Sequence, residues 1–593
     1  MKSAKERPQK LLMKALISRN NMILKKITLL LFIFLATSNM FAQQEKDTIA
    51  TEIINVVTSY TPTISDAFKS KDNPTINTKD GEKKKQEYKI HSTPVPSIFT
   101  PNTGGYKSAM QPTKKIIYPN YLKIGYGNYG TPLVETFLTR KNRAHEFDFM
   151  LYNKASNGGI KGVALKNNYL TTKIGLDYKN KQRYKTWTGS INYNRNMYNW
   201  YGLHKDTNFI TVLDAISEQQ VYDNLFFKGE VLLKKGKLKK AIASVNTFSD
   251  KFKSNEMNLF FNTKFEFPLK KNKILADASI EILNGEFKES YETIDKINYG
   301  QLTFGTAAYY PIQKENLFFS IGAKIKYNSD LEMNKSEFKV YPDLKIDYVL
   351  IDELFNIYGG VNGDLKQNTY RELVAMNPYA SPTLKILPTD NSYNAYAGLK
   401  GKLSSRIHYN VKATYSNENN KALFRLNKNL SDGTTTQDQG YKYGNSFDIV
   451  YDDIKTLDLF GEISTEIIDN VHIGANAHIK SFDTTNEPHA WNLTTLNTTI
   501  FGDFSFQKWR FGTEFYFVGK RKDLLVNSDD SEIIQFLKPY ADMNITANYQ
   551  FTSRWNGFID INNLFNQNYQ RFANFNVQGF QIMAGFKYQF NLK

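Results

Sequence analysis

The sequence predicts an all-β fold, a transmembrane antiparallel β-barrel of about 22 strands (roughly 20–24) with long extracellular loops and a mostly irregular N-terminal segment. Three observations support this. Segments of alternating apolar and polar residues recur from residue 120 to the end of the chain. Aromatic residues make up 14% of the 593 residues, although the mean hydropathy is only −0.49. The N-terminal region also has the features of an export signal.

The export signal comes first in the chain. Two lysines lead into an apolar run over residues 27–36, and a small-residue stretch ends at Ala42. This run is about half of the ~20 residues that a spanning helix needs, so we expect a cleaved signal peptide rather than an anchor. Met22 opens the signal and is the expected true start, so residues 1–42 are interpreted as a signal peptide with an upstream extension.

Residues 43–119 form the expected flexible periplasmic segment, because Lys, Thr, Ser and Pro dominate and little can be buried. One apolar island stands out within it: Ile53, Ile54, Asn55, Val56, Val57 and Thr58. A free strand with unpaired backbone groups can add to the sheet edge of a partner protein. Packing of this island inside the barrel or on its rim is the alternative.

The barrel is expected over residues 120–593. At 259–267 the residues on one face are Leu259, Phe261, Thr263, Phe265 and Phe267, opposite Asn258, Asn262, Lys264 and Glu266. Similar alternation occurs at 274–282, 317–328, 407–415, 471–480 and 509–517. Each segment has about the ~10 residues of a tilted outer-membrane strand, apolar toward lipid and polar toward the lumen. Because hydrocarbon leaves no backbone group unpaired, such an array must close. Together with the export signal, it predicts the outer membrane of a Gram-negative cell.

The last strand alternates to within three residues of the chain end. Its aromatic residues Phe586, Tyr588 and Phe590 are interpreted as the terminal-strand signal for the barrel-assembly machinery, and this strand is expected to close against the first. Two long connections, 202–220 and 363–394, are expected to face outward. The second contains an expected helical turn at 370–375. These loops either fill the barrel mouth or decorate the surface.

The segment Gly557–Tyr569 (GFIDINNLFNQNY), followed by the final strand, resembles the C-terminal end of TonB-dependent receptors. This resemblance implies transport of a solute, or ligand binding, across the outer membrane. It also identifies residues 53–58 with the TonB box, which pairs with the periplasmic energy transducer TonB. Family members fold a plug domain between box and barrel, whereas only about 60 residues separate Thr58 from Tyr121 here. The chain therefore resembles a plug-less relative.

Charge and motifs argue against other classes. The net charge is +18, of which residues 1–42 hold +7, so about 18 − 7 = +11 remains and is dispersed. Dispersed charge does not predict a nucleic-acid site, and suits anionic lipid headgroups or a mildly cationic pore. The G-x-G-x-x-G match at 125–130 precedes strand-like sequence instead of a helix, so a nucleotide site is not expected.

Catalytic and metal-binding groupings are also not predicted. The sequence has no cysteine and seven histidines, without an H-E-x-x-H motif. His408, His472 and His478 share an expected lumen face, where a weak metal or anion contact is the alternative to ordinary lumen polarity. We therefore predict no enzyme, cofactor or metal. The expected function is an outer-membrane transport barrel; the alternatives are a structural or assembly subunit that docks other envelope proteins, and a passive porin.

Overall fold

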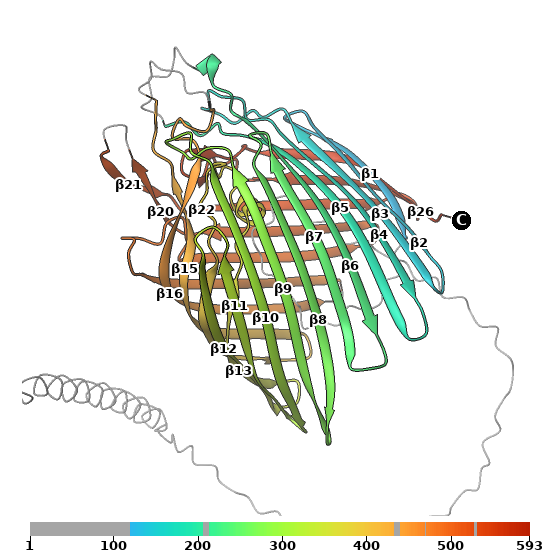
Figure 1. Ribbon diagram of the computed structural model, residues 1–593. Helices are drawn as coiled ribbons and strands as arrows, with labels where there is room; N and C mark the ends of the chain where they lie inside the picture. The colour runs from blue at the N-terminus through green and yellow to red at the C-terminus, as the bar shows by residue number, and fades with distance from the viewer. Residues whose placement is uncertain (1–118, 205–212, 432–438, 469, 527–529, 593) are drawn as a thin grey trace, which may run out of the picture. The chain divides into compact units, whose positions relative to one another are not determined.

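The computed structural model describes residues 119–204, 213–431, 439–468, 470–526 and 530–592 (Figure 1). The wall strands are β1 (Asn120–Gly127), β2 (Thr131–Lys141), β3 (His145–Ser156), β4 (Tyr169–Lys181), β5 (Lys185–Asn199), β6 (Gln219–Leu233), β7 (Leu238–Asp250), β8 (Asn255–Leu269), β9 (Asn272–Phe287), β10 (Ile297–Lys314), β11 (Leu317–Asp330), β12 (Lys335–Ile351), β13 (Phe355–Lys366), β14 (Thr389–Lys402), β15 (Ile407–Leu426), β16 (Phe447–Ile468), β17 (Val471–Thr484), β18 (Leu496–Phe506), β19 (Trp509–Val518), β22 (Tyr540–Gln550), β23 (Trp555–Asn562) and β26 (Gln581–Phe590).

These strands form one closed 22-stranded antiparallel barrel, which confirms the predicted fold class. Each strand pairs with its neighbours along the chain, and the ring closes where β1 pairs with β26, so the two ends of the colour scale meet in Figure 1. The closing register places Tyr121 opposite Gln589 and Gly127 opposite Met583. Closure leaves no exposed sheet edge in the wall, as a strand array in hydrocarbon requires.

Exposure of the strand side chains confirms the predicted alternation. Phe261 is 45% exposed, Ile321 49% and Val411 54%, as expected for residues that face lipid. Lys324 belongs to the same strand as Ile321 but points to the opposite face, where its ammonium lies 3.2 Å from the Asp343 carboxylate. The small residues at Gly125 and Gly127 are explained by crowding, because a Cβ on Gly125 would lie 2.7 Å from the ring of Phe558.

The two ends of the barrel differ in the length of their connections. At the end of the barrel where β1 begins and β26 finishes, the strands are joined by short turns, such as 142–144, 270–271 and 507–508. All of the long connections are at the opposite end: 157–168, 200–218, 367–388, 427–446, 485–495, 519–539 and 563–580. Short turns face the periplasm and long loops face outward in outer-membrane barrels, which orients the molecule.

The loops contain further elements. α2 (Tyr370–Met376) confirms the expected helical turn, within a loop slightly shorter than the predicted 363–394. Two hairpins were not predicted: β20 (Arg521–Val526) with β21 (Glu532–Leu537), and β24 (Gln570–Phe572) with β25 (Phe575–Asn576). A 3-10 turn covers Leu213–Ala215. The described ranges contain no helix that is long and apolar enough to cross a membrane.

Candidate binding site beneath the loops

The long extracellular loops pack together across the barrel mouth. Six of them contribute to a single cluster of buried hydrophobic side chains, which we call the loop cap: Ile160, Leu165, Trp200, Tyr201, Ile216, Tyr370, Leu373, Val374, Ala380, Leu384, Ile386, Tyr441, Tyr443, Leu525, Leu537, Ala573 and Phe575. Burying one such aromatic side chain stabilises the cap by about 1.5–3 kcal/mol. Mouth filling, one of the two roles predicted for the loops, is therefore the observed one.

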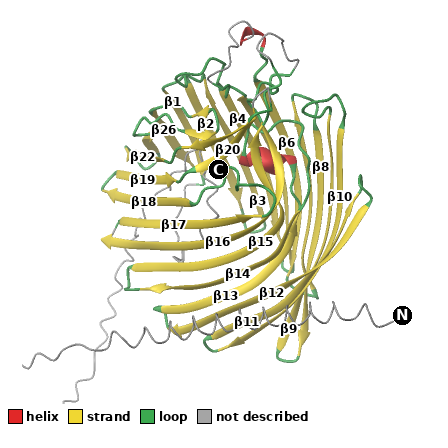
Figure 2. Cartoon of the chain, turned by 90° about the vertical axis from the view of Figure 1, so that its left-hand side faces the viewer, coloured by secondary structure: helices red, strands yellow, loops and turns green. Residues whose placement is uncertain are grey.

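α2 lies within the ring of strands at the loop end of the barrel (Figure 2), where a buried carboxylate of the wall anchors it. The Glu256 side chain accepts hydrogen bonds from the backbone N–H groups of Tyr370 and Arg371, and from the hydroxyl of Tyr299 at 3.0 Å. The Thr369 side chain caps the helix by accepting from the N–H of Glu372 at 3.1 Å. These contacts satisfy the free N–H groups of the first helical turn, so the helix is held in one place.

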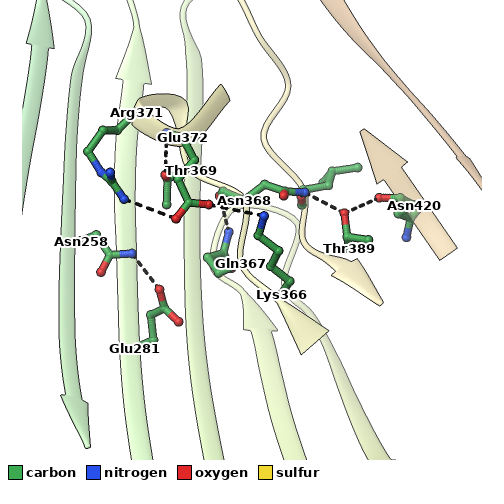
Figure 3. A network of polar contacts seen from close by, with 11 residues as sticks. Asn258, Glu281, Lys366, Gln367, Asn368, Thr369, Arg371, Glu372, Thr389 and Asn420 are labelled. Carbon is green, nitrogen blue, oxygen red and sulfur yellow. Dashed lines mark hydrogen bonds and ion pairs between the residues drawn. The ribbon is translucent and has the colours of Figure 1, made fainter. Parts of the chain in front are cut away.

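The base of the α2 loop is tied by the polar network in Figure 3. Asn368 donates to the carbonyl of Leu387 at 2.8 Å and to the hydroxyl of Thr389 at 2.9 Å, which draws the two ends of the loop together. Thr389 then donates to the carbonyl of Asn420 at 2.8 Å, linking the loop to β15. The loop is thus fixed at its base as well as at α2.

The loops also interlock directly. The Asn445 amide donates to the carbonyl of Trp200 at 2.7 Å, and the Trp200 ring N–H donates to the carbonyl of Tyr379 at 3.1 Å. Gly440 approaches the 200–218 loop so closely that a Cβ there would lie 1.8 Å from the carbonyl oxygen of Ser217. Any side chain at position 440 would force these two loops apart.

A chamber of about 440 Å³ lies beneath the loop cap. Its walls are lumen-facing residues of β3–β7, β19, β22, β23 and β26, and its roof comes from the 157–168, 200–218, 367–388 and 563–580 loops. Pockets that bind small molecules commonly have volumes of about 300–1,000 Å³. Ten asparagines and seven tyrosines line the chamber, so its surface is rich in amide and phenol groups.

Several of these polar groups are unused. The side chains of Asn194 and Asn224 lie opposite each other on β5 and β6, and the Asn224 carbonyl oxygen is buried without a partner. Asn196 and Asn562 have no side-chain hydrogen-bond partner within the described ranges. Each free amide offers two donors and one acceptor to a ligand. The sequence contains a signal for this surface, since the alternating asparagines of NYNRN (192–196) all point to one face.

The residues predicted to be functional from the sequence lie in different parts of the molecule. Residues 53–58 lie outside the described residues. Phe586, Tyr588 and Phe590 lie on β26 in the closing seam, with Phe586 58% exposed toward lipid; their role in assembly stays a prediction. His478 lies 3.0 Å from Asp458, and His472 packs near Phe501. The described residues include no group of three His, Cys, Asp or Glu side chains placed to hold a metal.

No family model matches the chain, and no curated protein matches it. Solved structures do. The FrpB iron transporter from Neisseria meningitidis has a TM-score of 0.60 at 10% identity, covering 79% of this chain and 81% of FrpB. The siderophore receptor PirA from Acinetobacter baumannii has a TM-score of 0.59 at 11% identity, with 79% and 80% covered. The copper transporter OprC has a TM-score of 0.58 at 11% identity, covering 79% of this chain and 82% of OprC.

The chain has the barrel fold of these solved transporters and receptors. At these identities the likeness concerns the fold alone, and it agrees with the large outer-membrane barrel predicted from strand alternation. The similar structures are transport receptors rather than enzymes. Ligand chemistry must therefore be argued from the residues of this chain.

Proposed function

We propose that the protein is a TonB-dependent receptor-like transport barrel in the outer membrane of a Gram-negative cell, with the chamber as its ligand site. The supporting observation is the chamber itself, a lumen-side pocket with unpaired amides directly under a cap built from loops. A buried amide oxygen without a partner, such as that of Asn224, is costly unless a ligand or water satisfies it. In this proposal the cap separates the chamber from the outside until it opens.

TonB would supply energy through residues 53–58 if transport is energised, because strand addition relies on backbone hydrogen bonds. The shortness of residues 59–120 supports a plug-less receptor, in which the loop cap takes over closure of the barrel. The barrel-assembly machinery and outer-membrane lipid are the other proposed partners. No catalytic role is proposed.

The cap also supports a second candidate, a structural or assembly subunit that docks other envelope proteins. Its buried aromatic residues, including Trp200 and Tyr370 at 1% and 0% exposure, would suit a permanently closed mouth. A passive porin is less well supported, because the loops pack into one cluster across the opening.

Planar-bilayer conductance separates these functions. In Gly440→Leu, the new side chain collides with the Ser217 carbonyl and should loosen the cap, so a transport barrel should show larger or more frequent open states than the wild type. Gly461→Leu is the matched control, because a Cβ at that position of β16 has nothing within 4 Å. Conductance that stays absent in both the wild type and Gly440→Leu would refute transport and favour the scaffold.

A further inference from the structure

The chamber carries an excess of positive charge. Lys154, Lys173, Arg371 and Arg571 line it, and Asp542 is its single lining carboxylate. That carboxylate is already engaged, because Tyr516 and Tyr569 donate to it at 2.9 and 3.1 Å. Arg371 is likewise engaged, 3.3 Å from Glu372. The lining cations that have no ion pair with a described residue are Lys154 and Lys173.

Lys154 is the most unusual of these cations. It is only 9% exposed, and its ammonium has neither an ion pair nor a hydrogen bond with any described residue. Three other lumen lysines have carboxylate partners: Lys123 lies 3.3 Å from Asp560, Lys264 3.7 Å from Asp277, and Lys324 3.2 Å from Asp343. Lys587 has no such partner but lies over the ring of Tyr121, 3.8 Å from its centroid. Burial of a charge without a partner is strongly unfavourable. Asp560, the carboxylate whose charge acts on Lys154, already pairs with Lys123 at 3.3 Å. An anion that arrives with the ligand would complete the charge balance of Lys154.

The groups around Lys154 complete the recognition surface. Lys154 lines both the chamber and an adjoining cavity of about 210 Å³, and Asn544, Asn562 and Gln581 line both cavities as well. The adjoining cavity also has four carboxylates that do not line the chamber: Glu135, Asp503, Glu514 and Asp560. Amide side chains can donate to and accept from hydroxyl groups at once. Tyrosine side chains add apolar ring faces with a polar tip. A cation surrounded by amides and phenol rings suits a ligand that is both charged and rich in hydroxyls.

We propose that the chamber binds an anionic, hydroxyl-rich solute of the acidic-sugar class, with Lys154 pairing its anionic group and Asn194, Asn196 and Asn562 contacting its hydroxyls. This assignment rests on the proposed transport function and names its substrate class. The anionic group is a carboxylate or a phosphate, since both pair with an ammonium.

Calorimetric binding to the purified full chain tests this with three probes: galacturonate, galactose 6-phosphate and galactose. At least one acid should bind ten-fold or more tightly than galactose, and which acid does so identifies the anionic group. Lys154→Met should lower that affinity ten-fold or more, whereas Lys264→Met, outside the chamber, should leave it unchanged. Added salt should weaken binding in the wild type, because it screens the ion pair.

Asn562→Leu tests the hydroxyl contacts separately. It should weaken binding of the preferred acidic sugar while inorganic phosphate or acetate, which lack the ring hydroxyls, binds as before. Equal affinity for all three sugars, no measurable binding of any, or equal loss in Lys154→Met and Lys264→Met would overturn the proposal. The outcome is distinct from failure of the transport function, because conductance of Gly440→Leu does not depend on which solute binds.

Discussion

Single residues in this barrel are governed by which side of the wall they face. Phe261 and Lys264 belong to the same strand, yet Phe261 is exposed on the lipid side and Lys264 lies in the lumen near Asp277. Period-two alternation determines these faces, because successive side chains of a strand point in opposite directions. The sequence was therefore sufficient to assign them.

Substitutions on the two faces should have opposite consequences for assembly. Phe261→Arg places a charge in hydrocarbon, which costs about 2–4 kcal/mol near the midplane, and should reduce the folded fraction. Lys264→Ala removes one lumen side chain and should leave assembly intact. Heat-modifiable mobility on gels measures the folded fraction. Loss of folding in Lys264→Ala but not in Phe261→Arg would invert the assigned faces.

The residues of the chamber could be assigned to the lumen from the sequence, but not to a binding site. Asn194 and Asn196 were predictable as lumen-facing, but nothing in strand periodicity distinguishes them from other polar residues of the wall. Lys154 is unusual only because no carboxylate lies opposite it on the neighbouring strands, where Leu133 and Thr171 pair with it. That absence depends on the register of three strands, which local sequence does not determine.

Among the elements, local sequence predicted α2 but not its anchor. The run from Thr369 to Glu372 has the spacing of a capping box, which explains why a helical turn forms there. The Glu256 carboxylate that holds it comes from 114 residues earlier in the chain. The β20–β21 hairpin was missed because its strands are only six residues long, shorter than the wall strands.

This hairpin should respond to pH through Asp523. Burial raises the pKa of Asp523 from 3.8 to about 6, although it accepts hydrogen bonds from the N–H groups of Leu426 and Leu524 and from Asn492, and lies near Arg425. Because the pKa in the folded protein is the higher one, folding favours the protonated form. The resulting stabilisation is full below about pH 4 and is lost as pH rises through about 6.

Hydrogen exchange at the Leu426 and Leu524 amides, corrected for intrinsic rates, should therefore show more protection at pH 5 than at pH 7.5. Asp523→Asn is neutral throughout and should flatten this difference. His489 of the 485–495 loop lies beside Lys522 of this hairpin and is a competing titratable group. If Asp523→Asn keeps the full pH effect, Asp523 is not its source.

At the scale of the whole molecule, the strand number, closure and orientation followed from the sequence, whereas the loop cap did not. In lipid, every backbone N–H and C=O group must form a hydrogen bond within the protein. A chain with this alternation can meet that requirement only as a closed barrel. The cap depends on contacts between loops far apart in sequence, such as Trp200 with Asn445. The length of the loops left two roles possible, filling the barrel mouth or decorating the surface. The contacts between the loops show that they fill the mouth.

The remaining question at this scale is whether the barrel is driven by TonB through residues 53–58. If that segment is a working TonB box, Val56→Pro should abolish uptake, because proline removes one N–H and fixes φ, whereas Val56→Ala keeps the backbone able to pair. Growth on the cognate solute, at equal amounts of surface-exposed barrel, measures the difference. Equal uptake in the two variants would show that opening of the loop cap needs no pull from the periplasm, and that this barrel works without the energy transducer.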